Sequence, residues 1–345
     1  MAIGACLCSC GGSQKEVYKD STAPVRDRVE DLLKRMTLEE KVGQMNQFVG
    51  VEHIKANSAV MTEEELKNNT ANAFYPGFTE KDIEKWTEEG LIGSFLHVLT
   101  IEEANYLQSL AMKSRLQIPI IFGIDAIHGN ANAPDNTVYP TNINLACSFD
   151  TLMAYKIARQ TAKEMRAMNM HWTFNPNVEV ARDARWGRVS EGNGEDPFLG
   201  AAIARAMVRG YQGKDMSRNN EIMACVKHFA LYGAPEAGRD YNTVDMSHQR
   251  MFNEYMLPYQ AAVEEGVGSV MASFNEVDGV PATGNKWLMT DVLRKQWGFG
   301  GFVVTDYTGI TEMTDHGMGD TQAVAALALN AGVDMDMVSD AFTST

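Results

Sequence analysis

Short apolar runs recur along this chain and alternate with amphipathic stretches. The runs read "GQMNQF", "IGSFLHV", "IPIIFGID", "WTFNPNV", "MACVKHF", "SVMASFN", "FVVTDY" and "VDMDM". Between many of them lie stretches with helical spacing of apolar residues, including 151–170, 201–213, 247–266 and 320–332. Apolar runs bounded by turn residues predict buried strands, and apolar residues three and four apart predict helices packed on one face. The pattern therefore predicts an α/β protein with a parallel sheet.

Eight strand candidates alternating with helices favour a (β/α)8 TIM-type barrel, a fold that takes about 250 residues. A doubly wound sheet is the alternative, but the GxGxxG turn expected after its first strand is missing. The last apolar run, at 333–337, is followed by only a few residues. We therefore expect a fragment in which the barrel lacks its closing C-terminal helix.

The first predicted helical stretch is residues 27–45, "DRVEDLLKRMTLEEKVGQM". Within it, Thr37 and Glu40 have the spacing of a capping box, in which each side chain caps the backbone of the other residue. A helix start is therefore expected at Thr37.

Composition narrows the class of function. The 345 residues carry a net charge of −15, and 45% of them are hydrophobic. These values are typical of globular proteins, and the acidity disfavours a nucleic-acid partner because phosphate binding needs a basic face. No apolar stretch is long enough to span a membrane.

Three of the five cysteines, Cys6, Cys8 and Cys10, lie in the N-terminal "MAIGACLCSCGGSQK". The segment "LCSC" resembles the lipobox of bacterial lipoproteins, with Cys10 as the acylated residue, although no basic region precedes it. We interpret residues 1–20 as a clipped lipoprotein signal and tether, and residues 21–345 as the barrel domain. This predicts a periplasmic or outer-membrane-anchored lipoprotein of a bacterium; the alternative is an incidental Cys/Gly-rich tail.

Polar residues close several of the predicted strands. In a barrel the carboxyl ends of the strands meet on one face, where active sites are built. The residues brought to that face would be Asp125 and His128; Arg182, Asp183, Arg185 and Arg188; Lys227 and His228; Met271, Phe274 and Asn275; and Asp306 and Tyr307.

Each of these residues also has a structural explanation. Asp125 and Asp306 could be helix N-caps, and Arg182 with Asp183 could form an ion pair at the rim. The seven histidines show no HExxH spacing, so a metal site is not predicted, and no phosphate-binding loop is present. A lysine-dependent aldolase using a Schiff base at Lys227 is one alternative chemistry.

A cage for a polyhydroxylated ring fits the set better. Asp125 would accept hydrogen bonds from sugar hydroxyls, while Lys227, His228 and Arg182 would donate them. Asp306 would then be free to attack an anomeric carbon, and neighbouring cations are expected to keep its pKa low.

At these residues the sequence resembles glycoside hydrolase family 3, the β-glucosidase and β-glucan exohydrolase group. The resemblance runs from about Arg26 to the end and rests on "GIDAIHG", "NPNVEVARDARWGR", "SEGNGEDP", "VKHFALYG", "RDYNTVDMS", "GVPATGNKWLMTDVLRKQWGFGGFVVTDY" and "AGVDMDM". It implies a barrel domain without metal or organic cofactor, a β-glucoside or oligosaccharide substrate, and Asp306 as the nucleophile. It assigns glycone contacts to Asp125, Arg182, Lys227, His228 and Arg239, the lining of the sugar to Met271 and Phe274, and the leaving-group side to Tyr307.

The resemblance also implies a second carboxyl group. Family members with a "KHFPGHGDT" loop carry their acid/base there, whereas this loop reads "KHFALYGAPEAGRD". Most other members take a glutamate from a following α/β sandwich domain. We therefore expect a retaining, exo-acting β-glucosidase-like enzyme whose acid/base lies in a missing downstream domain; the alternative is an inactive or glycan-binding barrel fragment.

Overall fold

The computed structural model describes residues 15–58 and 79–344. Eight parallel strands form one sheet in the order β10-β1-β2-β3-β4-β5-β6-β9. Contacts between Val304 and Met335 join its two ends, so the sheet closes into a barrel. The strands are β1 (Asn46–Val49), β2 (Ser94–Leu96), β3 (Ile121–Ile124), β4 (Trp172–Thr173), β5 (Met223–Phe229), β6 (Ser269–Ala272), β9 (Phe302–Val304) and β10 (Asp336–Met337). Each coincides with one of the eight predicted apolar runs, β1 extending one residue beyond its run to Val49, so the predicted TIM-type barrel is confirmed.

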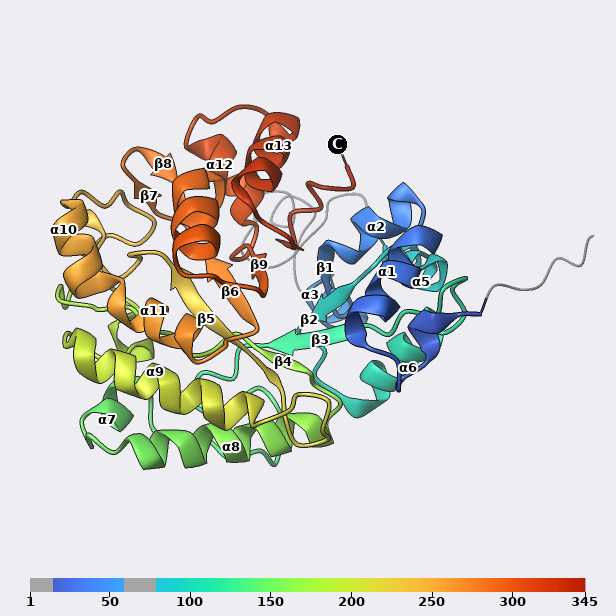
Figure 1. Ribbon diagram of the computed structural model, residues 1–345, viewed down its shortest axis with the longest axis horizontal. Helices are drawn as coiled ribbons and strands as arrows, with labels where there is room; N and C mark the ends of the chain where they lie inside the picture. The colour runs from blue at the N-terminus through green and yellow to red at the C-terminus, as the bar shows by residue number, and fades with distance from the viewer. Residues whose placement is uncertain (1–14, 59–78, 345) are drawn as a thin grey trace, which may run out of the picture.

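Helices surround the strands (Figure 1). Among these helices α8 packs against α9, and α9 packs against α11. The α-helices are α1 (Val25–Arg35), α2 (Leu38–Gln44), α3 (Val51–Ser58), α5 (Glu80–Glu89), α6 (Ile101–Ala111), α7 (Asn142–Ala146), α8 (Thr151–Ala167), α9 (Pro197–Gln212), α10 (His248–Arg250), α11 (Leu257–Glu264), α12 (Gly309–Asp315) and α13 (Thr321–Ala331). Two π-helical segments, η5 (Met251–Tyr255) and η7 (Trp287–Gln296), and the 3-10 turns η1 (Val17–Lys19), η3 (Val189–Glu191), η4 (Glu236–Gly238) and η6 (Ala282–Gly284) complete the set.

Side chains fill the barrel interior. The Trp172 indole N–H of β4 donates to the Ser269 hydroxyl of β6 at 2.8 Å, across strands that are not neighbours. Phe174 and Phe302 pack edge-on against the same indole, at centroid distances of 4.6 and 5.1 Å. A barrel of this size is a packed core rather than a pore, so its polar chemistry is confined to the strand ends.

The capping box predicted at Thr37 is present. The Thr37 hydroxyl accepts from the Glu40 backbone N–H at 3.2 Å, and the Glu40 carboxylate accepts from the Thr37 N–H at 2.8 Å. Because this cap starts α2, the predicted stretch 27–45 is two helices, α1 and α2, rather than one.

A short antiparallel hairpin was not predicted. It consists of β7 (Glu276–Val277) and β8 (Val280–Pro281) and follows β6 directly. Its strands have only two residues each, which is too short for an alternating hydrophobic pattern to be recognised in the sequence.

The N-terminal segment packs onto the barrel earlier than expected. Tyr18, inside the predicted tether, is buried and its hydroxyl donates to the Leu116 carbonyl at 3.1 Å. Cys10 and the predicted signal up to residue 14 lie outside the described residues. In the described part of the chain, none of the helices has the length and apolar character needed to cross a membrane.

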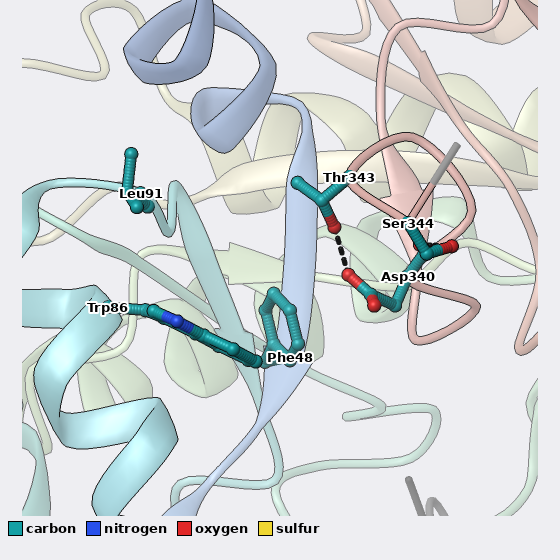
Figure 2. A pocket seen from close by; sticks show the side chains of 6 residues that line it. All are labelled: Phe48, Trp86, Leu91, Asp340, Thr343 and Ser344. Carbon is teal, nitrogen blue, oxygen red and sulfur yellow. Dashed lines mark hydrogen bonds between the residues drawn. The ribbon is translucent and has the colours of Figure 1, made fainter. Parts of the chain in front are cut away.

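An apolar pocket lies on the outer side of β1. Phe48, Trp86 and Leu91 line it from one side, and Asp340, Thr343 and Ser344 from the segment after β10 (Figure 2). Within the residues described up to Ser344, no helix follows β10. This pocket contains none of the predicted site residues, so it is separate from the polar strand ends.

The capping box gives a stability prediction. Replacing Thr37→Ala should lower the free energy of unfolding by about 1 kcal/mol, because the Glu40 N–H loses its acceptor. Thr141→Ala is the matched control, since Thr141 is the N-cap of α7 but, in the described structure, makes no side-chain cap hydrogen bond. Urea denaturation of both variants measures the difference; equal losses would contradict the assignment.

Candidate active site

The polar strand-end residues come together at one mouth of the barrel. Asp125 follows β3, Lys227 and His228 lie near the end of β5, and Asp306 lies two residues beyond β9. All these strands are parallel, so their carboxyl ends emerge on the same side.

The buried Lys227 forms an ion pair with the partly exposed Asp125, with 2.5 Å between Nζ and Oδ1. Burial is the largest effect and would lower the pKa of Lys227, but the Asp125 and Glu191 carboxylates together outweigh it and the pKa is raised. Lys227 is therefore a protonated hydrogen-bond donor, and a Schiff-base nucleophile, which must be neutral, is not favoured at this position.

His228 is held on both ring nitrogens. Its Nδ1 lies 2.7 Å from Glu179 Oε1, and its Nε2 lies 2.9 Å from Arg188 Nη2. A guanidinium only donates, so Nε2 accepts and the ring proton is on Nδ1. Burial, followed by the Arg188 and Lys227 charges, keeps the pKa of His228 well below its usual range. The expected role of His228 as a donor to sugar hydroxyls is not compatible with this arrangement, because its one N–H is used by Glu179.

The two oxygens of Asp306 differ. Oδ1 accepts from the Tyr307 backbone N–H at 2.7 Å. Oδ2 is buried and, among the described residues, has no hydrogen-bond partner, although His228 Nε2 lies 3.4 Å away. The next helix, α12, has Thr308 as its N-cap, so the helix-cap interpretation of Asp306 is wrong.

Burial raises the pKa of Asp306 to about 6, and the opposing charges of Arg188 and Lys227 only partly offset that rise. The expectation that neighbouring cations would keep this pKa low is therefore wrong: withdrawal from water outweighs them. Asp306 is nevertheless mostly ionised at neutral pH.

Arg182, the arginine predicted to bind the glycone, does not reach the cluster, and Arg188 does. Arg182 pairs with Glu254 and lies over the Tyr255 ring at 5.3 Å, away from Asp306. Arg188 reaches the cluster instead and donates to both oxygens of Glu191 at 2.7 and 2.9 Å. Both arginines belong to the motif "ARDARWGR", and the i,i+3 spacing of Arg188 and Glu191 was the only sequence signal that distinguished them.

Aromatic side chains form one wall beside the carboxylate. Phe274 belongs to a buried cluster with Ala181, Trp186 and Tyr232, against which Tyr307 also packs. Tyr241, which the sequence did not single out, stacks on Phe274 at 4.3 Å. Burial and then the Asp306 charge raise the pKa of Tyr241 to about 12, consistent with its position near that carboxylate.

The two remaining predicted residues differ in exposure. Met271 is buried within β6, in a strand that leads to the mouth. Arg239 is exposed in the loop after η4, where its backbone N–H donates to the Glu236 carbonyl and its own carbonyl accepts from the Asn242 N–H. Within the described chain no three His, Cys, Asp or Glu side chains are grouped as metal ligands would be.

Residues 37–345 match the family model for the N-terminal domain of glycosyl hydrolase family 3. The chain belongs to glycosyl hydrolase family 3. It is 38% identical to the periplasmic β-glucosidase of Salmonella typhimurium, over 93% of this chain and 39% of that protein. It is 37% identical to a β-xylosidase of Formosa agariphila, over 72% of this chain and 36% of that protein.

Solved structures agree with this membership in family 3. The β-glucosidase from Listeria innocua in complex with glucose has a TM-score of 0.81 and 37% identity, over 92% of this chain and 43% of that one. The exo-1,3/1,4-β-glucanase from a Pseudoalteromonas species has a TM-score of 0.73 and 33% identity, over 92% of this chain and 38% of that one. The chain thus spans about two fifths of the length of these relatives.

The raised pKa of Asp306 predicts a pH-dependent stability. An unfolded aspartate has a pKa of about 3.9. The folded state therefore binds more protons between about pH 4 and pH 6, and its free energy of unfolding falls as the pH rises through that window. Asp306→Asn removes this loss. The free energy of unfolding of the variant, minus that of the wild type, should therefore increase by about 2 to 3 kcal/mol from pH 4 to pH 8.

Urea denaturation at pH 4, 6 and 8 measures this gain. Asp183→Asn is the control, because the Arg185 hydrogen bond lowers the pKa of Asp183 to about 2. The effect of Asp183→Asn on the free energy of unfolding should change much less between pH 4 and pH 8. A constant difference between Asp306→Asn and the wild type over this range would contradict the raised pKa.

Proposed function

We propose that this chain is the nucleophile-bearing barrel of a retaining, exo-acting β-glycosidase of the β-glucosidase type. The observation that carries the proposal is Asp306 Oδ2, a buried carboxylate oxygen without a hydrogen-bond partner among the described residues. It lies at the barrel mouth beside His228, in a chain that belongs to a glycoside hydrolase family.

The proposed reaction has two displacements. Asp306 Oδ2 forms a bond to the anomeric carbon while the bond from that carbon to the glycosidic oxygen breaks, and the leaving oxygen takes a proton from an acid. Water then attacks the same carbon, gives its proton to the conjugate base, and releases Asp306. Two inversions retain the β configuration, and the two carboxyl groups of such enzymes stand about 5 to 5.5 Å apart.

The proton donor of this reaction is a glutamate that the family resemblance places in a second domain. The proposal therefore concerns the whole protein, since this chain spans about two fifths of its relatives' length. It assigns no carboxyl group of the described barrel to that role.

The sugar whose anomeric carbon is attacked lies in the −1 subsite. It would form hydrogen bonds with charged groups at the strand ends. Asp125 would accept from hydroxyls and Lys227 would donate to them. Arg188 takes the place first given to Arg182, because it lies at the cluster and Arg182 does not. Met271, Phe274 and Tyr307 would line the ring and the leaving-group side, and Arg239 would contribute from its loop.

The substrate class is a terminal β-linked glucoside or a related oligosaccharide. Relatives are named β-glucosidase and β-xylosidase, and the Listeria innocua enzyme was solved with glucose and, as a mutant, with laminaribiose. A periplasmic location is proposed from the Salmonella typhimurium relative's name, and lipid anchoring at Cys10 remains part of the proposal.

Covalent trapping on the 345-residue chain tests the proposal. A 2-deoxy-2-fluoro-β-glucoside with a dinitrophenolate leaving group needs no proton donor, so the barrel alone should be labelled. We expect one label per chain, on the peptide that contains Asp306, and a rate at least about 10³-fold lower in Asp306→Asn. Mass spectrometry of the digested protein locates the label.

Asp183→Asn is the matched control and should label at the wild-type rate, because Asp183 pairs with Arg185 outside the cluster. A label on another residue would contradict the nucleophile. Glucose binding without any labelling would favour the alternative, a glycan-binding barrel, and an imine trapped at Lys227 by borohydride would favour the aldolase.

A further inference from the structure

Glu179 is a buried acid that contacts His228, the residue next to the proposed nucleophile, and the proposed reaction does not use it. It lies in the segment after β4 that runs along β5, where the Val178 N–H donates to the Lys227 carbonyl at 3.0 Å. Its side chain is fully buried, and Oε1 accepts from both the backbone N–H and the ring Nδ1 of His228. One carboxylate oxygen thus fixes both the main chain and the imidazole of a single residue.

The hydrogen bonds to the two ring nitrogens determine the tautomer of His228. With Nδ1–H on Glu179 and Arg188 Nη2 donating to Nε2 at 2.9 Å, the Nε2 atom carries a lone pair and no proton. A second hydrogen bond supports the same orientation, since the Tyr259 hydroxyl donates to the His228 carbonyl at 2.7 Å.

The tautomer matters because Asp306 Oδ2 lies 3.4 Å from Nε2. An imidazole protonated on Nε2 would put the positive end of an N–H dipole close to Oδ2. A positive dipole beside a carboxylate stabilises its negative charge and so weakens its attack on carbon. With the proton on Nδ1, the Oδ2 atom keeps its electron pairs free.

We propose that Glu179 is a positioning residue that holds His228 in its Nδ1-protonated form and thereby leaves Asp306 Oδ2 free to attack the anomeric carbon. This inference rests on the proposed function, because it concerns the reactivity of the same nucleophile. The part of the inference that concerns the tautomer of His228 does not depend on that function.

The charge of Glu179 is not what holds the tautomer. Burial raises the pKa of Glu179 to about 7, and Oε2 is buried without a hydrogen-bond partner in the described structure. A proton taken up by Glu179 would therefore reside on Oε2, while Oε1 continues to accept. A glutamine at this position reproduces that protonated state, whereas a methionine removes the acceptor.

The groups that face His228 from the surrounding elements define what else could titrate in the same pH range. They are Glu179 after β4, Arg188 before η3, Lys227 in β5, Tyr232 at 5.2 Å between ring centroids, and Asp306 after β9. Glu179 and Asp306 are the two whose pKa values lie near neutrality, at about 7 and about 6.

Imidazole ¹⁵N NMR of the 345-residue chain reads the tautomer directly. The His228 signals are identified by their loss in His228→Asn. In the wild type we expect the Nδ1-protonated pattern, unchanged from pH 6 to pH 8. Glu179→Gln should keep it, and Glu179→Met should convert a measurable fraction to the Nε2-protonated form. Glu103→Gln is the matched control, a buried glutamate on α6 that also accepts a backbone N–H.

The trapping rate at Asp306 supplies the functional readout. Glu179→Gln should label within about threefold of the wild type, and Glu179→Met up to about 10-fold more slowly, because an N–H dipole on Nε2 would stabilise the carboxylate before it attacks. A wild-type spectrum with the Nε2-protonated pattern would overturn the inference even if Glu179→Met fails to fold. Equal labelling of a folded Glu179→Met would overturn its functional half.

Failure of the proposed function has a different signature. In that case the wild type itself is not labelled at Asp306, while the tautomer of His228 and its response to Glu179→Met can still be measured.

Discussion

The constraint on which the site depends is that charges withdrawn from water must be paired. Three cationic or polar groups lie at the barrel mouth, with Lys227 and His228 buried and Arg188 partly buried. Each has an acidic partner: Lys227 with Asp125, Arg188 with Glu191 and His228 with Glu179. An unpaired buried charge costs several kcal/mol, so these pairs hold one another in place. Among the described residues, Asp306 Oδ2 has no hydrogen-bonded cation, and burial raises the pKa of Asp306.

The barrel makes such pairing possible because it brings together residues far apart in sequence. Asp125 and Lys227 are 102 positions apart, and His228 and Glu179 are 49 apart. Each is carried by a strand or by a segment hydrogen-bonded to one, above an interior filled by Trp172 and its neighbours. A rigid support of this kind fixes the distances between charged atoms, on which the electrostatics depend.

Pairing also separates the residues proposed to bind the sugar from the residues that hold those side chains in place. Arg188 contacts both Glu191 and His228, so it cannot move independently of either. Arg182, only six residues earlier in the chain, pairs with Glu254 of η5 and therefore lies outside this cluster. The raised pKa of Asp306 reflects the free energy needed to keep its carboxylate charged away from water. This lowers the free energy of unfolding at neutral pH.

The sequence alone determined the barrel, because its eight strands are local apolar runs. It also predicted that Asp125, Lys227, His228 and Asp306 meet at one mouth, because each lies at or near the end of such a run. It also located the cap at Thr37, whose two partners are three residues apart. Tertiary structure decided which arginine joins the cluster, since the choice depends on Glu254, a residue 72 positions from Arg182. It also decided the pKa of Asp306 and the tautomer of His228. Both depend on burial and on atoms from several strands, and no local pattern encodes these distances.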